Sequence, residues 1–191
     1  MAKQPKPAPA TAASRASVLK PILVRLALFG GTMAAYYGIT ATAWFREDFF
    51  PYYLRLNAQA SAWLLNLFGE EAGVNGVTVH TAKYQLSIRK GCDAIEPCAL
   101  LIAALLVSPA TWKEKWPAFA LGLPLLLVLN LVRIVSLYYT GVHSPELFET
   151  MHVDVWQPGF VALTMIVWAV WAAIVMSRRK PPASAAASGP A

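Results

Sequence analysis

Long apolar segments are the feature that most constrains this chain. Three of them, at residues 26–45, 117–139 and 155–176, reach the roughly 20 residues that a helix needs to cross a bilayer. A fourth, at residues 93–107, is shorter. With 57% hydrophobic and 14% charged residues among 191, the chain has too few charges to cover a soluble domain. The sequence therefore predicts an all-α membrane protein with about four transmembrane helices.

The regions outside the apolar segments divide the chain further. Residues 1–20 are rich in Ala, Pro, Lys and Ser, a composition typical of a disordered basic tail. Residues 177–191 begin with a basic cluster and continue as a second tail of Pro, Ala and Ser. We expect residues 21–176 to form one membrane-embedded domain between two cytoplasmic tails.

Two different periodicities lie between the first two apolar segments. Residues 54–68 place Leu56, Trp63 and Leu67 on one helical face and polar residues on another, which predicts an interfacial helix lying on the membrane. Residues 77–79 and 84–88 instead alternate apolar and polar side chains at period two. This pattern predicts a short β-hairpin that turns near residues 81–83.

Basic residues collect on one side of the predicted spans. The two tails and the loop at 108–116 carry nine cations: Lys3, Lys6, Arg15, Lys20, Lys113, Lys115, Arg178, Arg179 and Lys180. Glu114 is the single acid among them, whereas the loop at 140–154 contains no Lys or Arg. By the positive-inside rule, the termini face the cytoplasm, and the hairpin and the 140–154 loop face outward.

Cys92 lies where the hairpin leads into the second span. Residues 91–96, Gly-Cys-Asp-Ala-Ile-Glu, have the form of a helix start with an acid at the third helical position. A thiol at a helix N-terminus feels the positive end of the dipole, and Arg89 and Lys90 add positive charge, so we expect a favoured thiolate. Cys98 lies about 9 Å further along the helix, and we interpret it as a packed apolar residue.

Arg133 is the only cation inside the segment at 117–139. A charge at this depth costs at least about 2.5–3.5 kcal/mol on insertion scales, and such residues usually serve a site. Glu96, about one turn below Cys92, is a candidate ion-pair partner. Asn130, one turn deeper than Arg133 on the same face, could hold the guanidinium by a hydrogen bond. A purely structural ion pair is the alternative interpretation.

His152 stands at the outer end of the fourth span, and histidine is the usual proton shuttle near neutral pH. The predicted topology brings Cys92, Arg133 and His152 to one level on the outer face. A cysteine nucleophile needs a base, its tetrahedral intermediate needs a positive donor, and a leaving amine needs a proton. These three residue types match the three tasks. The sequence has no metal-ligand spacing and no phosphate-binding glycine loop, so no metal or cofactor is expected.

The order of these residues resembles the exosortase/archaeosortase family of membrane transpeptidases over roughly residues 20–176. The resemblance rests on Arg-Lys-Gly-Cys at 89–92 leading into a span, on Asn-Leu-Val-Arg-Ile-Val-Ser-Leu at 130–137, and on His152 before the last span. The short length and the form of residues 91–96 most resemble exosortase H. Ala94 departs from the pattern, because related sequences often carry Gly two residues after the cysteine.

The resemblance implies an enzyme of the bacterial cytoplasmic membrane with its active site on the periplasmic face. Its substrates would be exported proteins that end in a sorting tail, made of a short motif, one transmembrane helix and a basic cluster. Cys92 would attack the scissile carbonyl, Arg133 would stabilise the thiolate or the oxyanion, and His152 would transfer protons. An unknown acceptor nucleophile would resolve the thioester. The edge of the hairpin could hold the extended motif by strand addition.

Two other functions remain open from the sequence. A thiol redox protein would use Cys92 and Cys98 together, and both cysteines would then matter for function. A non-enzymatic membrane scaffold would use Arg133 and Glu96 as a structural pair, and replacement of Cys92 would then be silent.

Overall fold

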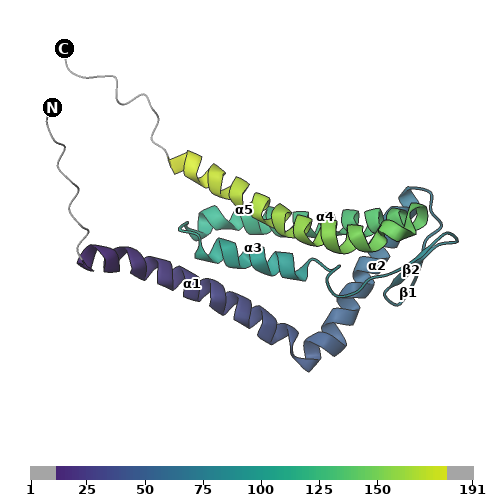
Figure 1. Ribbon diagram of the computed structural model, residues 1–191, viewed down its shortest axis with the longest axis horizontal. Helices are drawn as coiled ribbons and strands as arrows, with labels where there is room; N and C mark the ends of the chain where they lie inside the picture. The colour runs from purple at the N-terminus through teal and green to yellow at the C-terminus, as the bar shows by residue number, and fades with distance from the viewer. Residues whose placement is uncertain (1–11, 180–191) are drawn as a thin grey trace, which may run out of the picture.

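The computed structural model describes residues 12–179, and the outer parts of both predicted tails, residues 1–11 and 180–191, lie outside the described residues. Within this part of the chain, four helices run along the long axis of the molecule (Figure 1): α1 (Ala12–Thr40), α3 (Ile95–Val107), α4 (Trp112–His143) and α5 (Gln157–Arg179). Helix α3 packs against the other three and forms the centre of the bundle. The predicted all-α membrane fold is confirmed.

Within the part of the chain that the structure describes, three helical stretches are long and apolar enough to cross a bilayer: Leu19–Thr40, Trp112–His143 and Pro145–Arg179. Helix α3, the fourth predicted span, has 13 residues. At a rise of 1.5 Å per residue it is about 20 Å long, which is less than the roughly 30 Å of a hydrocarbon core. Large apolar side chains on the outside of the bundle suit a lipid environment, for example Leu23, Leu121 and Ile166 at 61%, 72% and 56% exposure.

Helix α1 begins at Ala12, so residues 12–20 are helical rather than part of a disordered tail. The following apolar span already provides a helical nucleus, and residues such as Ala, Leu, Arg and Lys extend a helix at little cost. The start of α1, the turn between α3 and α4, and the end of α5 all lie at one end of the bundle (Figure 1).

A small antiparallel sheet lies at the opposite end. Its strands are β1 (Gly73–Asn75), β2 (Thr78–His80) and β3 (Gln85–Ser87), in the order β1-β2-β3. The predicted hairpin corresponds to β2 and β3, in which Val79 pairs with Leu86. Strand β1 was not predicted; it is joined to β2 through Gly76, whose φ of 62° suits a tight hairpin turn.

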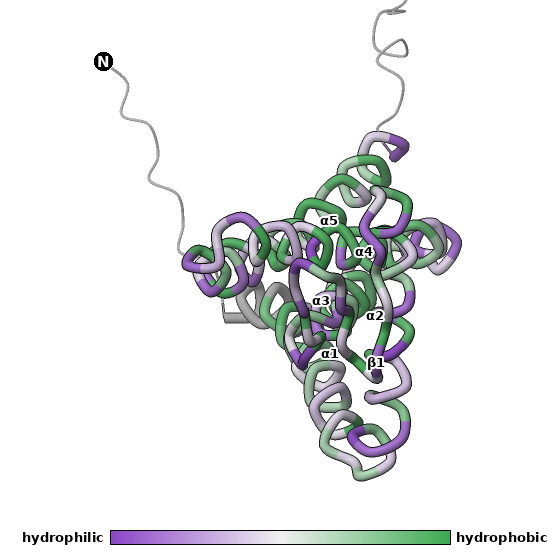
Figure 2. Tube along the Cα trace, turned by 90° about the vertical axis from the view of Figure 1, so that its right-hand side faces the viewer, coloured by the Kyte–Doolittle hydropathy of each residue, from purple (hydrophilic) through white to green (hydrophobic). Residues whose placement is uncertain are grey.

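Helix α2 (Phe50–Leu67) crosses the direction of the bundle at a steep angle (Figure 1). Figure 2 shows a mixture of hydrophobic and hydrophilic residues along α2, in contrast to the mostly hydrophobic α5. The predicted apolar face is exposed, with Trp63 at 65% and Leu67 at 62%. The face that packs inward instead carries small or polar residues as well as leucines: Leu54, Asn57, Ala58, Ser61, Ala62 and Leu65. An exposed apolar face is what an interfacial helix requires, so this prediction stands.

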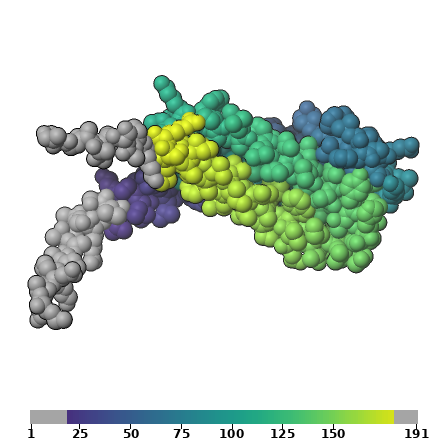
Figure 3. All heavy atoms as spheres, turned by 90° about the horizontal axis from the view of Figure 1, so that it is seen from above, coloured from purple at the N-terminus to yellow at the C-terminus, as the bar shows by residue number. Residues whose placement is uncertain are grey.

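Both ends of α4 extend beyond the predicted span. The helix begins at Trp112, because the Thr111 hydroxyl and the Glu114 carboxylate form a capping box at its start. It continues to His143, and the π-helix η3 (Thr150–Trp156) leads directly into α5. The polar loop predicted at residues 140–154 is therefore mostly helical. In the space-filling view, α5 runs along one face of the elongated molecule (Figure 3).

Candidate active site

The side chains of Cys92 and His152 meet although they are 60 residues apart in the chain. The Cys92 Sγ atom lies 2.9 Å from the His152 Nε2 atom, which is hydrogen-bonding distance. Cys92 belongs to the turn between β3 and α3, and His152 belongs to η3. Cys92 is buried and His152 is partly exposed. A nucleophile and a proton acceptor in direct contact are the minimal arrangement for cysteine-based nucleophilic catalysis.

The turn that presents Cys92 is closed by the Asp93 carboxylate. Its two oxygens accept hydrogen bonds from the backbone N–H groups of Gly91 at 3.0 Å and Ile95 at 2.8 Å. Helix α3 begins at Ile95, three residues after the cysteine, and its N-cap is Ala94. The second span was predicted to begin at about Asp93, directly after the cysteine; the helix begins two residues later, because the chain makes this turn first.

Ala94 adopts a left-handed conformation, with φ of 61° and ψ of 5°. It is the only residue other than glycine with positive φ in the described part of the chain. This conformation strains a residue with a Cβ atom, which explains why a glycine suits this position.

The environment of the thiol differs from the one that the sequence predicted. Burial raises the pKa of Cys92 above its ordinary value, and the positive charge of Arg133 acts in the opposite direction. Arg89 and Lys90, which were expected to favour the thiolate, are exposed. The groups inside the protein that lie near this thiol are therefore His152, at hydrogen-bonding distance, and the Arg133 cation.

Arg133 connects the two segments that carry Cys92 and His152. Its guanidinium donates to the Gly91 carbonyl oxygen at 2.7 Å and to the His152 carbonyl oxygen at 3.5 Å. The residue is 2% exposed, and its guanidinium lies 5.7 Å from the centre of the Phe160 ring. The Nε atom has no hydrogen-bond partner. This buried cation therefore binds the backbone of both segments that carry the Cys92–His152 pair, called the dyad below, and it places a positive charge next to that pair.

The two predicted partners of Arg133 bind elsewhere. The ion pairs among the side chains described, residues 19–179, are Lys83 with Glu70 and Arg179 with Glu114, so none of these involves Arg133. Glu96 accepts a hydrogen bond from the Tyr37 hydroxyl at 2.8 Å instead. Tyr37 lies on α1, so the Glu96 side chain faces α1.

Asn130 supports the site in a way that the sequence did not predict. Its amide donates to the Cys92 carbonyl oxygen and to Asn57 Oδ1, each at 3.1 Å, rather than binding Arg133. The Tyr53 hydroxyl donates to the Asp93 carbonyl oxygen at 2.5 Å. Helix α2, which carries Tyr53 and Asn57, therefore buttresses the cysteine turn. Asn57 and Ser61 lie four residues apart, on one face of α2, and both are buried. This polar spacing was the signal in the sequence that could have predicted the buried polar face.

Two cavities adjoin the dyad. The smaller, of about 260 Å³, is lined by both Cys92 and His152, by residues 84–89, and by Ile134, Leu137, Phe148 and Glu149. The larger, of about 740 Å³, lies between α1, the start of α3 and the start of α5, and is lined by the guanidinium-bearing Arg133 and by Gly91. Of the two cavities, only the smaller is lined by both Cys92 and His152.

Cys98 is partly buried in α3, and both cysteines are free thiols. Among residues 12–179, no group of three or more His, Cys, Asp or Glu residues is arranged to hold a metal ion.

A model of the family described as Transmembrane exosortase (Exosortase_EpsH) matches residues 32–172, which is more than half of the chain. The chain therefore belongs to the transmembrane exosortase family, a family of membrane protein-sorting enzymes, and the family predicted from the sequence is confirmed. Searches of curated proteins and of solved structures found no match.

Proposed function

We propose that this protein is a cysteine transpeptidase or protease that cleaves the C-terminal sorting tails of exported proteins and transfers the proteins to an acceptor through a thioester. The observation that carries the proposal is the contact between Cys92 Sγ and His152 Nε2 at 2.9 Å. Membership of the exosortase family supports it.

The reaction begins when His152 accepts the proton of Cys92 and the sulfur attacks the scissile carbonyl carbon. The tetrahedral intermediate carries an oxyanion, for which the buried charge of Arg133 is the stabilising group. When the intermediate collapses, the C–N bond breaks and His152 gives its proton to the leaving amine. An acceptor nucleophile then loses a proton to His152, attacks the thioester and releases Cys92. Water as the acceptor gives hydrolysis, and an amine gives transpeptidation.

The proposed location is the bacterial cytoplasmic membrane, with the site on the periplasmic side and both termini in the cytoplasm. The charge distribution supports this orientation.

The short length of α3 bears on how deep the segment before it lies in the membrane. A helix of about 20 Å leaves part of the bilayer thickness to the segment that precedes it. Non-helical backbone is tolerated at that depth only when protein surrounds it. Cys92, Asp93 and Ala94, directly before α3, are buried, whereas Arg89, Lys90 and Gly91 are exposed.

The test uses a tagged reporter protein that ends in a candidate tail, namely an extended motif, an apolar helix of about 20 residues and a Lys/Arg cluster. A panel of such tails is co-expressed with the wild type, Cys92→Ala, His152→Ala and Cys98→Ala. We expect cleavage by the wild type and Cys98→Ala and none by the other two. Full activity of Cys92→Ala would refute the proposal. Equal loss in Cys92→Ala and Cys98→Ala would favour the thiol redox alternative.

A further inference from the structure

We propose that the free edge of β3 is a peptide-binding subsite, where an extended segment of the substrate adds to the sheet as a further strand. The segment is the one that directly precedes the scissile bond. This inference rests on the proposed function, and it assigns to the hairpin a specific edge and specific backbone groups.

The sheet leaves the outer backbone groups of β3 unpaired. The order β1-β2-β3 places β3 at the edge. Tyr84 accepts a backbone hydrogen bond from Thr81, and Ile88 donates one to Val77, so residues 84, 86 and 88 face β2. In an antiparallel ladder the intervening residues point their N–H and C=O groups the other way. Gln85 and Ser87 therefore present these groups to the open edge.

This edge borders the smaller cavity and leads to the nucleophile. Residues 84–89 form one wall of the cavity of about 260 Å³, Phe148, Glu149 and His152 form another, and Cys92 also lines it. The strand residues in this wall span about 10 Å at roughly 3.3 Å per residue. That length pairs with about three residues of a peptide, and a peptide held there continues to Cys92 and His152.

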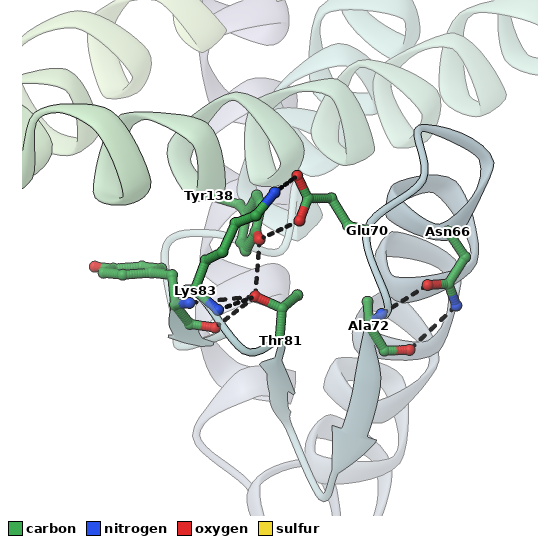
Figure 4. Close-up of polar contacts among 7 residues, drawn as sticks. Asn66, Glu70, Ala72, Thr81, Lys83 and Tyr138 are labelled. Carbon is green, nitrogen blue, oxygen red and sulfur yellow. Dashed lines mark hydrogen bonds and ion pairs between the residues drawn. The ribbon is translucent and has the colours of Figure 1, made fainter.

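A hydrogen-bonded network fixes the position of this edge (Figure 4). The Glu70 carboxylate accepts from Lys83 Nζ at 2.8 Å and from the Tyr138 hydroxyl at 3.1 Å. The Tyr138 hydroxyl also bonds to Thr81 Oγ1 at 2.8 Å, and Thr81 Oγ1 accepts from the backbone N–H of Tyr84. The turn between β2 and β3 is thus tied both to the chain after α2 and to α4. An edge held in place binds a peptide at a lower entropic cost than a mobile one.

The location of the sheet explains which part of the substrate it holds. The sheet lies at the end of the bundle opposite the start of α1 and the end of α5 (Figure 1). In the proposed substrates, the transmembrane helix follows the scissile bond and enters the membrane. The extended segment before the bond is then the part that remains at the level of β3.

The first test removes one backbone donor without changing the ladder to β2. Gln85→Pro deletes only the outward N–H, and proline is tolerated at such edge positions. Gln85→Ala is the matched control, because the Gln85 side chain is exposed. With the same reporter tail, we expect kcat/KM to be about fivefold lower for Gln85→Pro than for Gln85→Ala, mainly through KM. The rate of Cys92 alkylation by iodoacetamide should be equal in all three proteins if the dyad is intact.

Equal cleavage by Gln85→Pro and Gln85→Ala, with equal alkylation, would overturn the subsite and leave the proposed function standing. A second measurement does not depend on catalysis. Ser87→Cys is combined with Cys92→Ala and Cys98→Ala, and single cysteines are scanned through the extended segment of the reporter. Neighbouring strands bring Cα atoms to about 4.5–5.5 Å, within disulfide reach. We expect cross-linking at every second position of the segment, and its absence at all positions would refute strand addition even if no tail is cleaved.

Discussion

Replacement of Asn130 by Ala tests whether α4 holds the cysteine turn in place. Asn130 is fully buried, and its side-chain amide donates to the carbonyl oxygen of Cys92 and to Asn57 Oδ1. The substitution removes both hydrogen bonds at once. We expect a less stable protein in which Cys92 is less firmly positioned opposite His152.

The magnitude follows from the contacts. Each lost hydrogen bond removes about 1 kcal/mol, and the two acceptors left in a buried site add a desolvation penalty of similar size. The Asn130 Oδ1 atom itself has no partner, so its deletion offsets part of this loss. The expected decrease in the free energy of unfolding is about 2–3 kcal/mol.

The assay is reversible denaturant unfolding in detergent micelles, followed by tryptophan fluorescence and circular dichroism. Val132→Ala is the matched control on the same helix, because Val132 is 46% exposed on the outside of the bundle. The tail-cleavage rate of each variant is measured in parallel. If Asn130→Ala unfolds within about 0.5 kcal/mol of Val132→Ala and cleaves at the wild-type rate, the proposed support of the cysteine turn is wrong.

Three further predictions concern charge and backbone strain. Arg133→Gln removes the cation that lowers the Cys92 pKa, so the pH profile of Cys92 alkylation should shift to higher pH, and an unchanged profile would contradict this role. Ala94→Gly relieves a left-handed strain of about 1–2 kcal/mol but makes the unfolded chain more flexible, so we expect retained cleavage and a gain of about 1 kcal/mol or less in denaturant unfolding. Hydrogen bonding from Lys83 lowers the pKa of Glu70, so the contribution of Glu70 to stability is present above the ordinary glutamate pKa and is lost as the pH falls through its lowered value. The protection factors of the β2 and β3 amides, which correct exchange rates for their intrinsic pH dependence, should therefore fall in acid for the wild type, and Glu70→Gln should remove this fall.

The contacts of Arg133 show how a membrane protein can retain a buried cation that forms no ion pair within the described residues. Insertion of an arginine at this depth costs at least about 2.5–3.5 kcal/mol. Two backbone carbonyl groups and the face of Phe160 offset part of this cost. The positive charge of Arg133 lowers the pKa of Cys92, and the negative charge of the nearby Asp93 raises it.

The sequence by itself determined those features that depend on local periodicity and on residue type. The long apolar segments predicted the bundle helices, and alternation at period two predicted the pairing of β2 with β3. The residue types Cys, Arg and His defined a possible chemistry. The distribution of Lys and Arg along the chain predicted a topology in which Cys92 and His152 lie at the same end of the bundle.

Only the tertiary structure decided which polar groups meet. Glu96 bonds to Tyr37 on α1, and Asn130 on α4 bonds to the carbonyl group of Cys92 in the turn that Asp93 closes; both contacts depend on how α1 and α4 pack against α3. The contact between Cys92 and His152 depends on how helices far apart in the sequence are rotated about their axes. That rotation is set by the packing of many side chains at once, and a pattern within one segment contains no information about it.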